Sequence, residues 1–139
     1  MIAIIGFYNR AFGAQSRLSF SDDFQHCNIV MFDGADYVLT EFGSGGIENR
    51  VLKVTSLPRF LSALKNISYM TNLLVLWIDP RMTWGWSPFL IRSCNEICRY
   101  TAGLDIGRTY NPRHLYKKLL RLNGERNYRI DYRWSRKNG

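Results

Sequence analysis

Cysteine and histidine are scarce in this chain of 139 residues, and its apolar runs are short. Three cysteines are too few, and odd in number, for a disulfide framework, so we expect a reducing compartment. Cys94 and Cys98 are followed by one nearby histidine, His114, which is not the spacing of a structural zinc site; we expect no metal and no cofactor. The runs at residues 2–7 and 73–78 are too short for a signal peptide or a membrane span, so we expect neither.

Acidic residues are scarce in the last quarter of the chain, and this accounts for the whole net charge. The chain has 19 Lys and Arg against 11 Asp and Glu, which gives a formal charge of +8. Residues 1–107 hold nine of each sign, whereas residues 108–139 hold ten basic and two acidic residues. With 46% hydrophobic residues, the chain can form a globular core, which excludes a wholly disordered protein. We expect one domain at residues 1–126, electrically balanced as far as residue 107, and a basic, aromatic tail at residues 127–139.

The spacing of the apolar residues predicts a mixture of strands and helices. Two short apolar runs flank Asp33-Gly34, a sequence typical of a β-hairpin turn. This pattern favours the α+β class, with a small antiparallel sheet packed against helices. The expected strands are residues 2–7, 27–32, 37–42, 47–54 and 73–78, and the expected helices are residues 57–65, a helix starting at Ser93, and a helix from Asn111-Pro112 to about residue 122.

The helix start at Ser93 makes Cys94 the best candidate for a nucleophile. Ser93 and Glu96 have the spacing of a capping box, in which the Ser93 hydroxyl accepts from the Glu96 amide and the Glu96 carboxylate reaches back to the Ser93 amide. A cysteine in the first helical turn lies near free amides and the positive end of the helix dipole, which favour the thiolate. The alternative is that Cys94 is a small apolar residue packed under the helix.

A thiolate nucleophile needs a base, and the chain offers two histidines. His114 lies in the first turn of a basic helix, where a solvated role is simplest. His26 precedes the first strand of the predicted hairpin, and Glu41 lies at the far end of the second strand, roughly opposite. Glu41 is therefore placed to orient His26 through its second ring nitrogen. The alternative is a structural histidine at the sheet edge.

The order of these residues resembles that of a known family. A histidine opening a strand, a polar residue ending the next strand and a cysteine opening a later helix are similar to the circularly permuted papain-like hydrolases, the permuted branch of the NlpC-type superfamily. Short phage-encoded members are most similar in two segments, which here read SCNEICRYTAGL (93–104) and NPRHLYKKL (111–119). The resemblance covers residues 24–120. The chain departs from the pattern at Cys27, where many relatives carry an aliphatic residue.

The resemblance implies a permuted papain-like topology and a phage-associated thiol hydrolase that cleaves an amide or ester bond. It implies Cys94 as nucleophile, His26 as base and Glu41 as the orienting group, with the Cys94 amide as a candidate oxyanion donor. The alternative is a catalytically inactive virion or tail component on the same scaffold. In either case we expect the protein in the virion or the host cytoplasm, with other virion or phage proteins as partners.

Two aromatic segments have two interpretations each. Trp84 and Trp86 lie just upstream of Cys94, where they could line a substrate cleft or cover the core. The tail at residues 127–139 interleaves aromatic rings with cations, which suits docking onto an acidic protein surface or contact with nucleic acid, and we favour protein. The candidate partner-binding residues of this tail are Arg129, Arg133, Trp134, Arg136 and Lys137.

Overall fold

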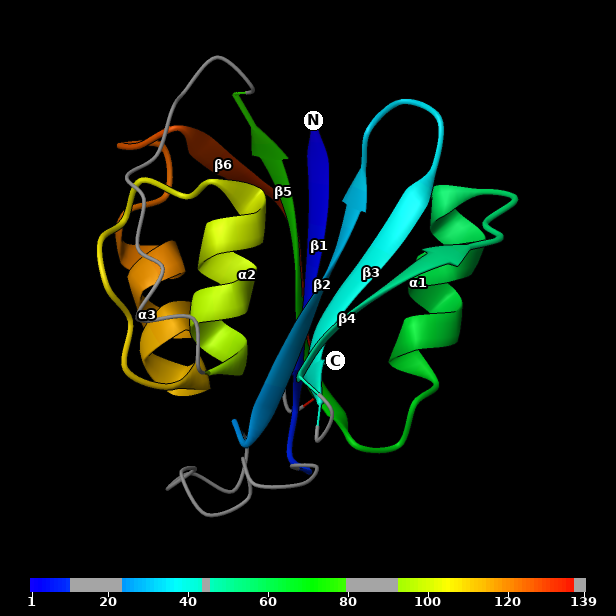
Figure 1. Cartoon of the computed structure of the whole chain (residues 1–139), viewed down its shortest axis with the longest axis horizontal. Coiled ribbons are helices and arrows are strands. Elements are labelled where there is room, and N and C mark those ends of the chain that lie inside the picture. The colour runs from blue at the N-terminus through cyan, green and yellow to red at the C-terminus, as the bar shows by residue number, and fades with distance from the viewer. Residues whose placement is uncertain (11–23, 44–45, 80–92, 137–139) are drawn as a thin grey trace.

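A six-stranded antiparallel sheet lies between three helices, with α2 and α3 on one face and α1 on the other (Figure 1). The computed structural model describes residues 1–10, 24–43, 46–79 and 93–136. The strand order is β4-β3-β2-β1-β5-β6, and every neighbouring pair is antiparallel. The elements are β1 (Ile2–Tyr8), β2 (His26–Phe32), β3 (Tyr37–Gly43), β4 (Gly46–Leu52), α1 (Leu57–Lys65), β5 (Met70–Ile78), α2 (Cys94–Ala102), α3 (Pro112–Arg121) and β6 (Tyr128–Ser135). The expected α+β class is confirmed.

The central strand β1 separates two hydrophobic cores. Successive side chains of a strand point to opposite faces. Ala3, Ile5 and Phe7 therefore pack under α2 and α3, whereas Ile4 and Tyr8 pack on the side of α1. Because both faces of β1 are covered, its sequence is an almost continuous apolar run instead of an alternating one.

Local signals fix most element boundaries where the sequence predicted them. In the hairpin turn, Asp33 Oδ1 accepts hydrogen bonds of 2.9 Å from the amides of Ala35 and Asp36. Gly34 adopts a positive φ of 102°, a conformation that glycine takes without strain. Asn111 caps α3 by accepting from the amide of His114 at 2.8 Å. These contacts join residues close in sequence, which is why the sequence alone predicts them.

The capping box at α2 is only half formed. The Ser93 hydroxyl accepts from the Glu96 amide at 3.4 Å, as expected. The Glu96 carboxylate instead forms an ion pair with Arg99, whose Nε lies 2.7 Å away, and accepts from the hydroxyl of Thr109 at 2.9 Å. The prediction that it reaches back to the Ser93 amide is therefore wrong. The reason is that the buried carboxylate gains a cation and a hydroxyl from the segment that packs beside the helix.

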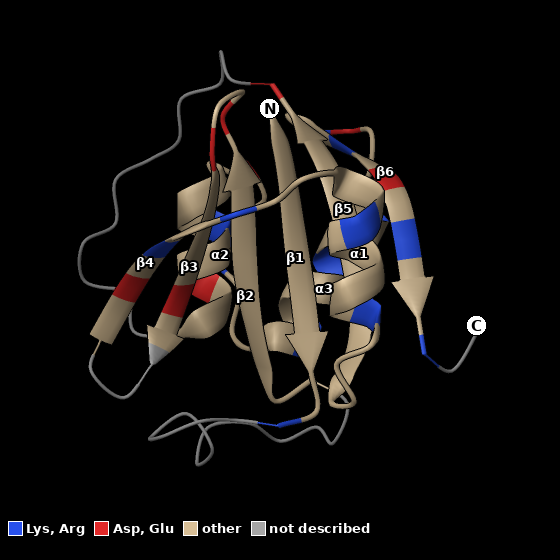
Figure 2. Ribbon diagram, turned by 90° about the vertical axis from the view of Figure 1, so that its right-hand side faces the viewer, with Lys and Arg blue, Asp and Glu red and all other residues tan. Residues whose placement is uncertain are grey.

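The expected tail is a strand of the sheet. Residues 128–135 form β6, which pairs with β5 from Asn72↔Ser135 to Ile78↔Tyr128. Figure 2 shows β6 at one edge of the sheet, with its basic positions in blue. The boundary expected at residue 126, with a tail beyond it, is corrected accordingly, because strand β5 supplies the backbone partners that hold these residues.

Arg136 ends the strand by binding carbonyl oxygens of the main body. Its guanidinium donates to the carbonyls of Lys65, Ile67 and Met70 at 2.8–3.0 Å. Lys65 ends α1 and Met70 begins β5. Arg136 therefore ties the last described residues to the segment that connects α1 with β5. Among the described residues, no helix is both long and apolar enough to span a membrane.

Candidate functional site

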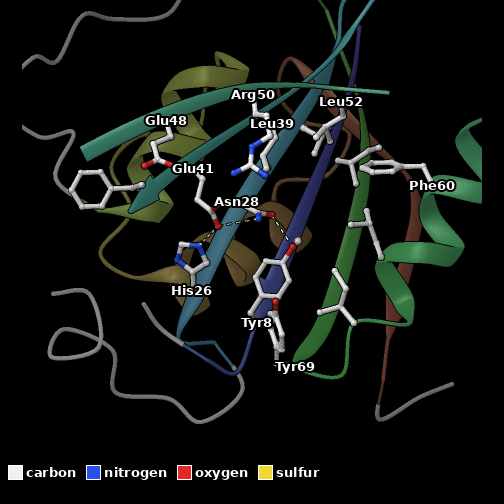
Figure 3. A pocket seen from close by; sticks show the side chains of 16 residues that line it. Tyr8, His26, Asn28, Leu39, Glu41, Glu48, Arg50, Leu52, Phe60 and Tyr69 are labelled. Carbon is white, nitrogen blue, oxygen red and sulfur yellow. Dashed lines mark hydrogen bonds and ion pairs between the residues drawn. The ribbon is translucent and has the colours of Figure 1, made fainter. Parts of the chain in front are cut away.

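The site lies where strands β2 and β3 diverge. Their backbone ladder runs from Phe32↔Tyr37 to Ile29↔Thr40, and the start of β2 and the end of β3 extend beyond it. Across this opening, His26 Nε2 lies 2.9 Å from Glu41 Oε1. The His26 side chain is 1% exposed and that of Glu41 is 30% exposed. The pair expected from the hairpin is therefore formed by side chains in a region where the two backbones do not pair (Figure 3).

Two further residues hold Glu41, and the sequence did not identify them. Asn28 Nδ2 donates to Glu41 Oε1 at 3.3 Å, and the Tyr8 hydroxyl donates to Asn28 Oδ1 at 3.0 Å (Figure 3). Space for this hydroxyl comes from Gly6, where an added Cβ would lie 2.8 Å from it. Asn28 could have been found, because it follows His26 by two positions in a strand and must share its face. Tyr8 comes from a neighbouring strand and carried no such signal.

Cys94 approaches the same histidine from the other face of the sheet. It is the first residue of α2, after the N-cap Ser93, and its side chain is 4% exposed. Cys94 lies close enough to the His26 ring and to Cys27 for both residues to shift the pKa of its thiol. The three residues expected to act together are therefore gathered in one place.

Electrostatics favour a charged pair. Hydrogen bonding from Cys27 is the largest cause lowering the pKa of Cys94; burial opposes it, and His26 adds to it, leaving the pKa at about 5. Burial lowers the pKa of His26, but hydrogen bonds to Cys94 and Glu41 outweigh burial and raise it to about 9. Between about pH 5 and pH 9 the pair is therefore thiolate and imidazolium. The His26 ring in turn holds the pKa of Glu41 below its ordinary value.

Three free thiols, one of them that of Cys94, lie in the core on the α2–α3 side of the sheet. Cys27, Cys94 and Cys98 are all buried in the core cluster under α2 and α3. The sulfurs of Cys98 and Cys27 are in hydrogen-bond contact at 3.7 Å. Burial raises the pKa of Cys27 well above its ordinary value, and the hydrogen bond to Cys94 raises it further, so Cys27 stays protonated and donates to the Cys94 sulfur. No functional role was predicted for Cys27, because the cysteine that its sulfur contacts is 71 positions away in the chain.

A cavity of about 530 Å³ opens on the α1 side of the site (Figure 3). His26, Asn28 and Glu41 form one polar wall, and Arg50 adds a cation from the outermost strand β4. The rest of the wall comes mostly from apolar side chains of the sheet and α1, including Ile4, Val30, Leu39, Leu52, Phe60, Leu64 and Ile67. Because His26 lines this cavity while Cys94 belongs to the core on the other face, the pair connects the two faces at the open end of β2.

The other candidate residues fall into two groups. Trp84, Trp86 and Lys137 lie outside the described residues. The remaining residues expected to bind a partner lie on or next to β6, at the opposite end of the sheet from β3 and β4: Arg129, Arg133, Trp134 and Arg136.

The second histidine is engaged on α3. Nδ1 of His114 accepts from the amide of Tyr110 at 3.0 Å, and its ring stacks on the Tyr110 ring with centroids 5.1 Å apart. Burial and the nearby charges of Lys118 and Arg121 lower its pKa. Its pKa is therefore shifted in the opposite direction from that of His26.

Neither a metal centre nor a known relative helps to identify the site. Within residues 1–10, 24–43, 46–79 and 93–136, no group of three or more His, Cys, Asp or Glu side chains is placed to hold a metal ion. Comparison of the chain with family models, with curated proteins and with solved structures found no match. Inference about function therefore depends on the geometry of the described residues.

Proposed function

We propose that the chain is a thiol hydrolase of amide or ester bonds, with a permuted papain-like topology and a phage association. The observation that carries the proposal is the closeness of Cys94 to His26, whose Nε2 lies 2.9 Å from Glu41 Oε1. A nucleophile, a base and a third group that orients the base are the parts that covalent catalysis by a cysteine requires. Their order along the chain, with histidine before cysteine, supports the permuted topology.

The proposed reaction proceeds through an acyl-enzyme. The Cys94 thiolate attacks the carbonyl carbon, and the His26 imidazolium gives its proton to the leaving amine or alkoxide as the scissile bond breaks. Neutral His26 then takes a proton from the water that attacks the thioester, and Cys94 leaves again as the thiolate. Glu41 keeps the ring in place and stabilises its charged form throughout.

The start of α2 suits the negative charge that develops on the carbonyl oxygen. Cys94 is the first helical residue, and an amide at that position has no acceptor within the helix. The positive end of the helix dipole points in the same direction. The Cys94 amide is therefore the proposed oxyanion donor, as a fixed backbone group that needs no rearrangement.

A second candidate is an inactive virion or tail component on the same scaffold. The burial of Cys94, which is 4% exposed, favours this candidate, because a nucleophile must reach its substrate. Its proposed means of docking has less support, because Arg133 and Arg136 are engaged within the fold: Arg133 donates to the Tyr116 hydroxyl at 3.2 Å, and Arg136 binds three carbonyls.

Alkylation by iodoacetamide tests the reactive pair without knowledge of the substrate. We expect the rate at Cys94 to rise through about pH 5, where the thiolate forms. In the His26→Ala variant, we expect this midpoint to move toward the ordinary thiol value of about 8.5. Cys98→Ala is the matched control, because it removes a thiol from the same helix without touching the pair. Equal, slow labelling of all three cysteines would contradict the proposal.

Hydrolysis of a fluorogenic short-chain acyl ester then separates the two candidates. We expect turnover in the wild type and in Cys98→Ala, none above background in Cys94→Ala, and a loss of about 10²–10⁴-fold in His26→Ala. Intact-mass measurement during turnover should show the acyl group on Cys94. A reactive Cys94 that never becomes acylated by any of a panel of esters and amides would favour the inactive component.

A further inference from the structure

The thiol of Cys27 lowers the pKa of Cys94 but makes or breaks no bond in the proposed hydrolysis. The reaction uses Cys94, His26 and Glu41, and the space at position 27 lies in an apolar core that an aliphatic side chain would fill as well. Cys27 is instead one of three free, buried cysteines in one core cluster, and its sulfur contacts that of Cys98. A second thiol beside a thiolate nucleophile is the arrangement in which an oxidised cysteine can be resolved as a disulfide.

The fold brings these thiols together from two elements. Cys27 follows His26 in β2, so its side chain points to the opposite face of the sheet, toward α2. Cys94 and Cys98 are separated by one helical turn and share the face of α2 that packs on β2. Cys27 therefore lies beside both: its sulfur is 3.7 Å from that of Cys98, and it is near enough to Cys94 to shift the pKa of that thiol.

We propose that Cys94 is a site of reversible oxidation by hydroperoxides and that Cys27 is its resolving thiol, so that oxidation closes a Cys27–Cys94 disulfide between β2 and α2. The proposal depends on the Cys94 thiolate, as the proposed function does, but not on hydrolysis. The substrate is hydrogen peroxide or a small organic hydroperoxide, and the product is an inactive protein that a dithiol reductant restores.

The first step uses the same ion pair as the proposed hydrolysis. The Cys94 thiolate attacks one peroxide oxygen; the S–O bond forms as the O–O bond breaks, and His26 imidazolium gives its proton to the departing hydroxide. Cys94 becomes a sulfenic acid, one water is released and His26 is left neutral. A low-pKa thiolate beside a proton donor is the form of cysteine that reacts fastest in this step.

The second step consumes the thiol of Cys27. Its sulfur attacks the Cys94 sulfur; the S–S bond forms, the S–O bond breaks, and hydroxide leaves with the Cys27 proton as water. In total, two thiols are oxidised and one hydrogen peroxide is reduced to two waters. The two side chains lie in the same core cluster, so the sulfurs need only a local approach to reach the disulfide length of about 2.05 Å.

The environment of Cys27 changes in favour of this second step once Cys94 is oxidised. Burial is the main reason that the pKa of Cys27 is high, and the hydrogen bond and negative charge of Cys94 add to it. The sulfenic acid carries no charge, so this second contribution disappears while that of burial stays. Because burial still keeps the Cys27 thiol protonated, we expect the disulfide to form more slowly than the sulfenic acid that precedes it.

The experiment treats the reduced full-length protein with one equivalent of hydrogen peroxide and maps its cysteines by mass spectrometry. We expect the wild type to lose the mass of two hydrogens, with a linked pair of peptides containing Cys27 and Cys94, reversed by dithiothreitol. The matched variants are Cys98→Ala, in which we expect the same disulfide, and Cys27→Ala, in which dimedone should trap a persistent sulfenic acid at Cys94. Cys27→Ser replaces the alanine variant if circular dichroism shows that the latter is unfolded.

The outcomes separate this proposal from the proposed function. A Cys27–Cys98 disulfide, over-oxidation of wild-type Cys94 to the sulfinic acid without a disulfide, or no reaction with peroxide would each overturn the proposal. If the Cys27–Cys94 disulfide forms but no ester or amide is ever turned over, the hydrolase fails and the oxidation site stands. If the ester is hydrolysed and peroxide leaves the thiols free, the hydrolase stands and the oxidation site fails.

Discussion

The open end of β2 and β3 and the closed pair β5–β6 use polar side chains in opposite ways. At β2 and β3 the backbone ladder stops at Ile29↔Thr40, and His26 and Glu41 bond to each other across the opening. At β5 and β6 the ladder continues to Asn72↔Ser135. Just beyond it, the Arg136 guanidinium binds backbone carbonyls. The first region keeps titratable groups available to a neighbouring thiol and a cavity, whereas the second uses its cations to hold the sheet together.

The comparison changes the meaning of the basic C-terminal segment. Its charge predicted a docking tail, but a strand with cations on it can also be an edge strand that resists pairing with other chains. Arg129 lies 2.9 Å from Asp131 and over the ring of Trp77, and Arg133 donates to the Tyr116 hydroxyl. Each of these contacts is made within the chain, so the positive charge of β6 is partly used for its own packing.

The largest effect should come from removing β6. A chain that ends at Asn127 leaves the edge of β5 unpaired and loses Tyr128, which is 2% exposed and donates to the Leu119 carbonyl at 2.6 Å. We expect this to exceed the total stability of a small domain, about 5–15 kcal/mol, so that no cooperative unfolding is seen. Urea unfolding followed by circular dichroism measures it. A truncated chain with an unchanged midpoint would show that these residues are a separable tail after all.

A contrast between Arg129 of β6 and Arg136, the residue that follows β6, tests the same point. Arg136→Ala removes the donor of three carbonyl hydrogen bonds, and we expect a loss of about 2 kcal/mol in the free energy of unfolding. Arg129→Ala, the matched control, removes an exposed ion pair and should cost less than about 1 kcal/mol. Denaturant midpoints compare the two variants. Equal effects would mean that the carbonyl contacts of Arg136 contribute no more to the free energy of unfolding than the exposed ion pair of Arg129.

At the open end of β2 and β3, Glu41→Gln should change titration more than stability. The variant removes the carboxylate charge that helps to raise the pKa of His26 to about 9, so we expect that pKa to fall by about one unit or more. The raised pKa stabilises the fold below pH 6.5, and this contribution is lost as pH rises through about 9; the variant should lose it at lower pH.

Proton NMR of the two histidine rings measures this shift directly. His114 is the internal reference, because its pKa is lowered by burial and by Lys118 and Arg121 and should not respond to Glu41. In the wild type we expect one ring to titrate above and the other below the ordinary value of about 6.5. Two rings that both titrate near the ordinary value would remove the electrostatic basis of the ion pair.

The smallest effect should come from Tyr8→Phe. The variant keeps the ring but removes the hydroxyl that donates to Asn28, which in turn holds Glu41. We expect a loss of about 1 kcal/mol in the free energy of unfolding, the net value of one hydrogen bond. Tyr110→Phe is the control, because that ring is 72% exposed, and its midpoint should not move. A loss as large as that of Arg136→Ala would place the Tyr8 network among the elements that hold the sheet together.

Much of the fold and part of the site could be predicted from the sequence. The hairpin turn at Asp33, the caps of α2 and α3 and the α+β class were predicted correctly, because each depends on residues close to one another in the chain. The closeness of His26 and Glu41 was also predicted from the hairpin, although the observed register places Glu41 nearer to Asn28 and the pair forms beyond the end of the ladder. Their catalytic roles stay predictions, and so does the use of Trp84 and Trp86, which lie outside the described residues.

The strand β6 was missed although its alternating sequence carries a strand signal. Aromatic or apolar residues alternate with charged ones from Tyr128 to Trp134, which suggested a docking surface. A register shift opposite Val75 and Leu76 places Tyr128 and Ile130 on the α2–α3 side but Trp134 on the α1 side. One continuous alternation therefore serves both cores, and no local pattern indicates that.

By itself, the sequence determined where the strands and helices other than β6 form, because turns, caps and apolar spacing act over a few residues. Only the tertiary structure decided that the basic segment forms an edge strand of the sheet and that Cys27 and Cys98 lie in the same core cluster as Cys94. Cys27 and Cys98 are 71 positions apart yet 3.7 Å from each other. Such contacts arise from the packing of α2 on β2, a long-range arrangement that burial of the whole core selects and no short segment encodes.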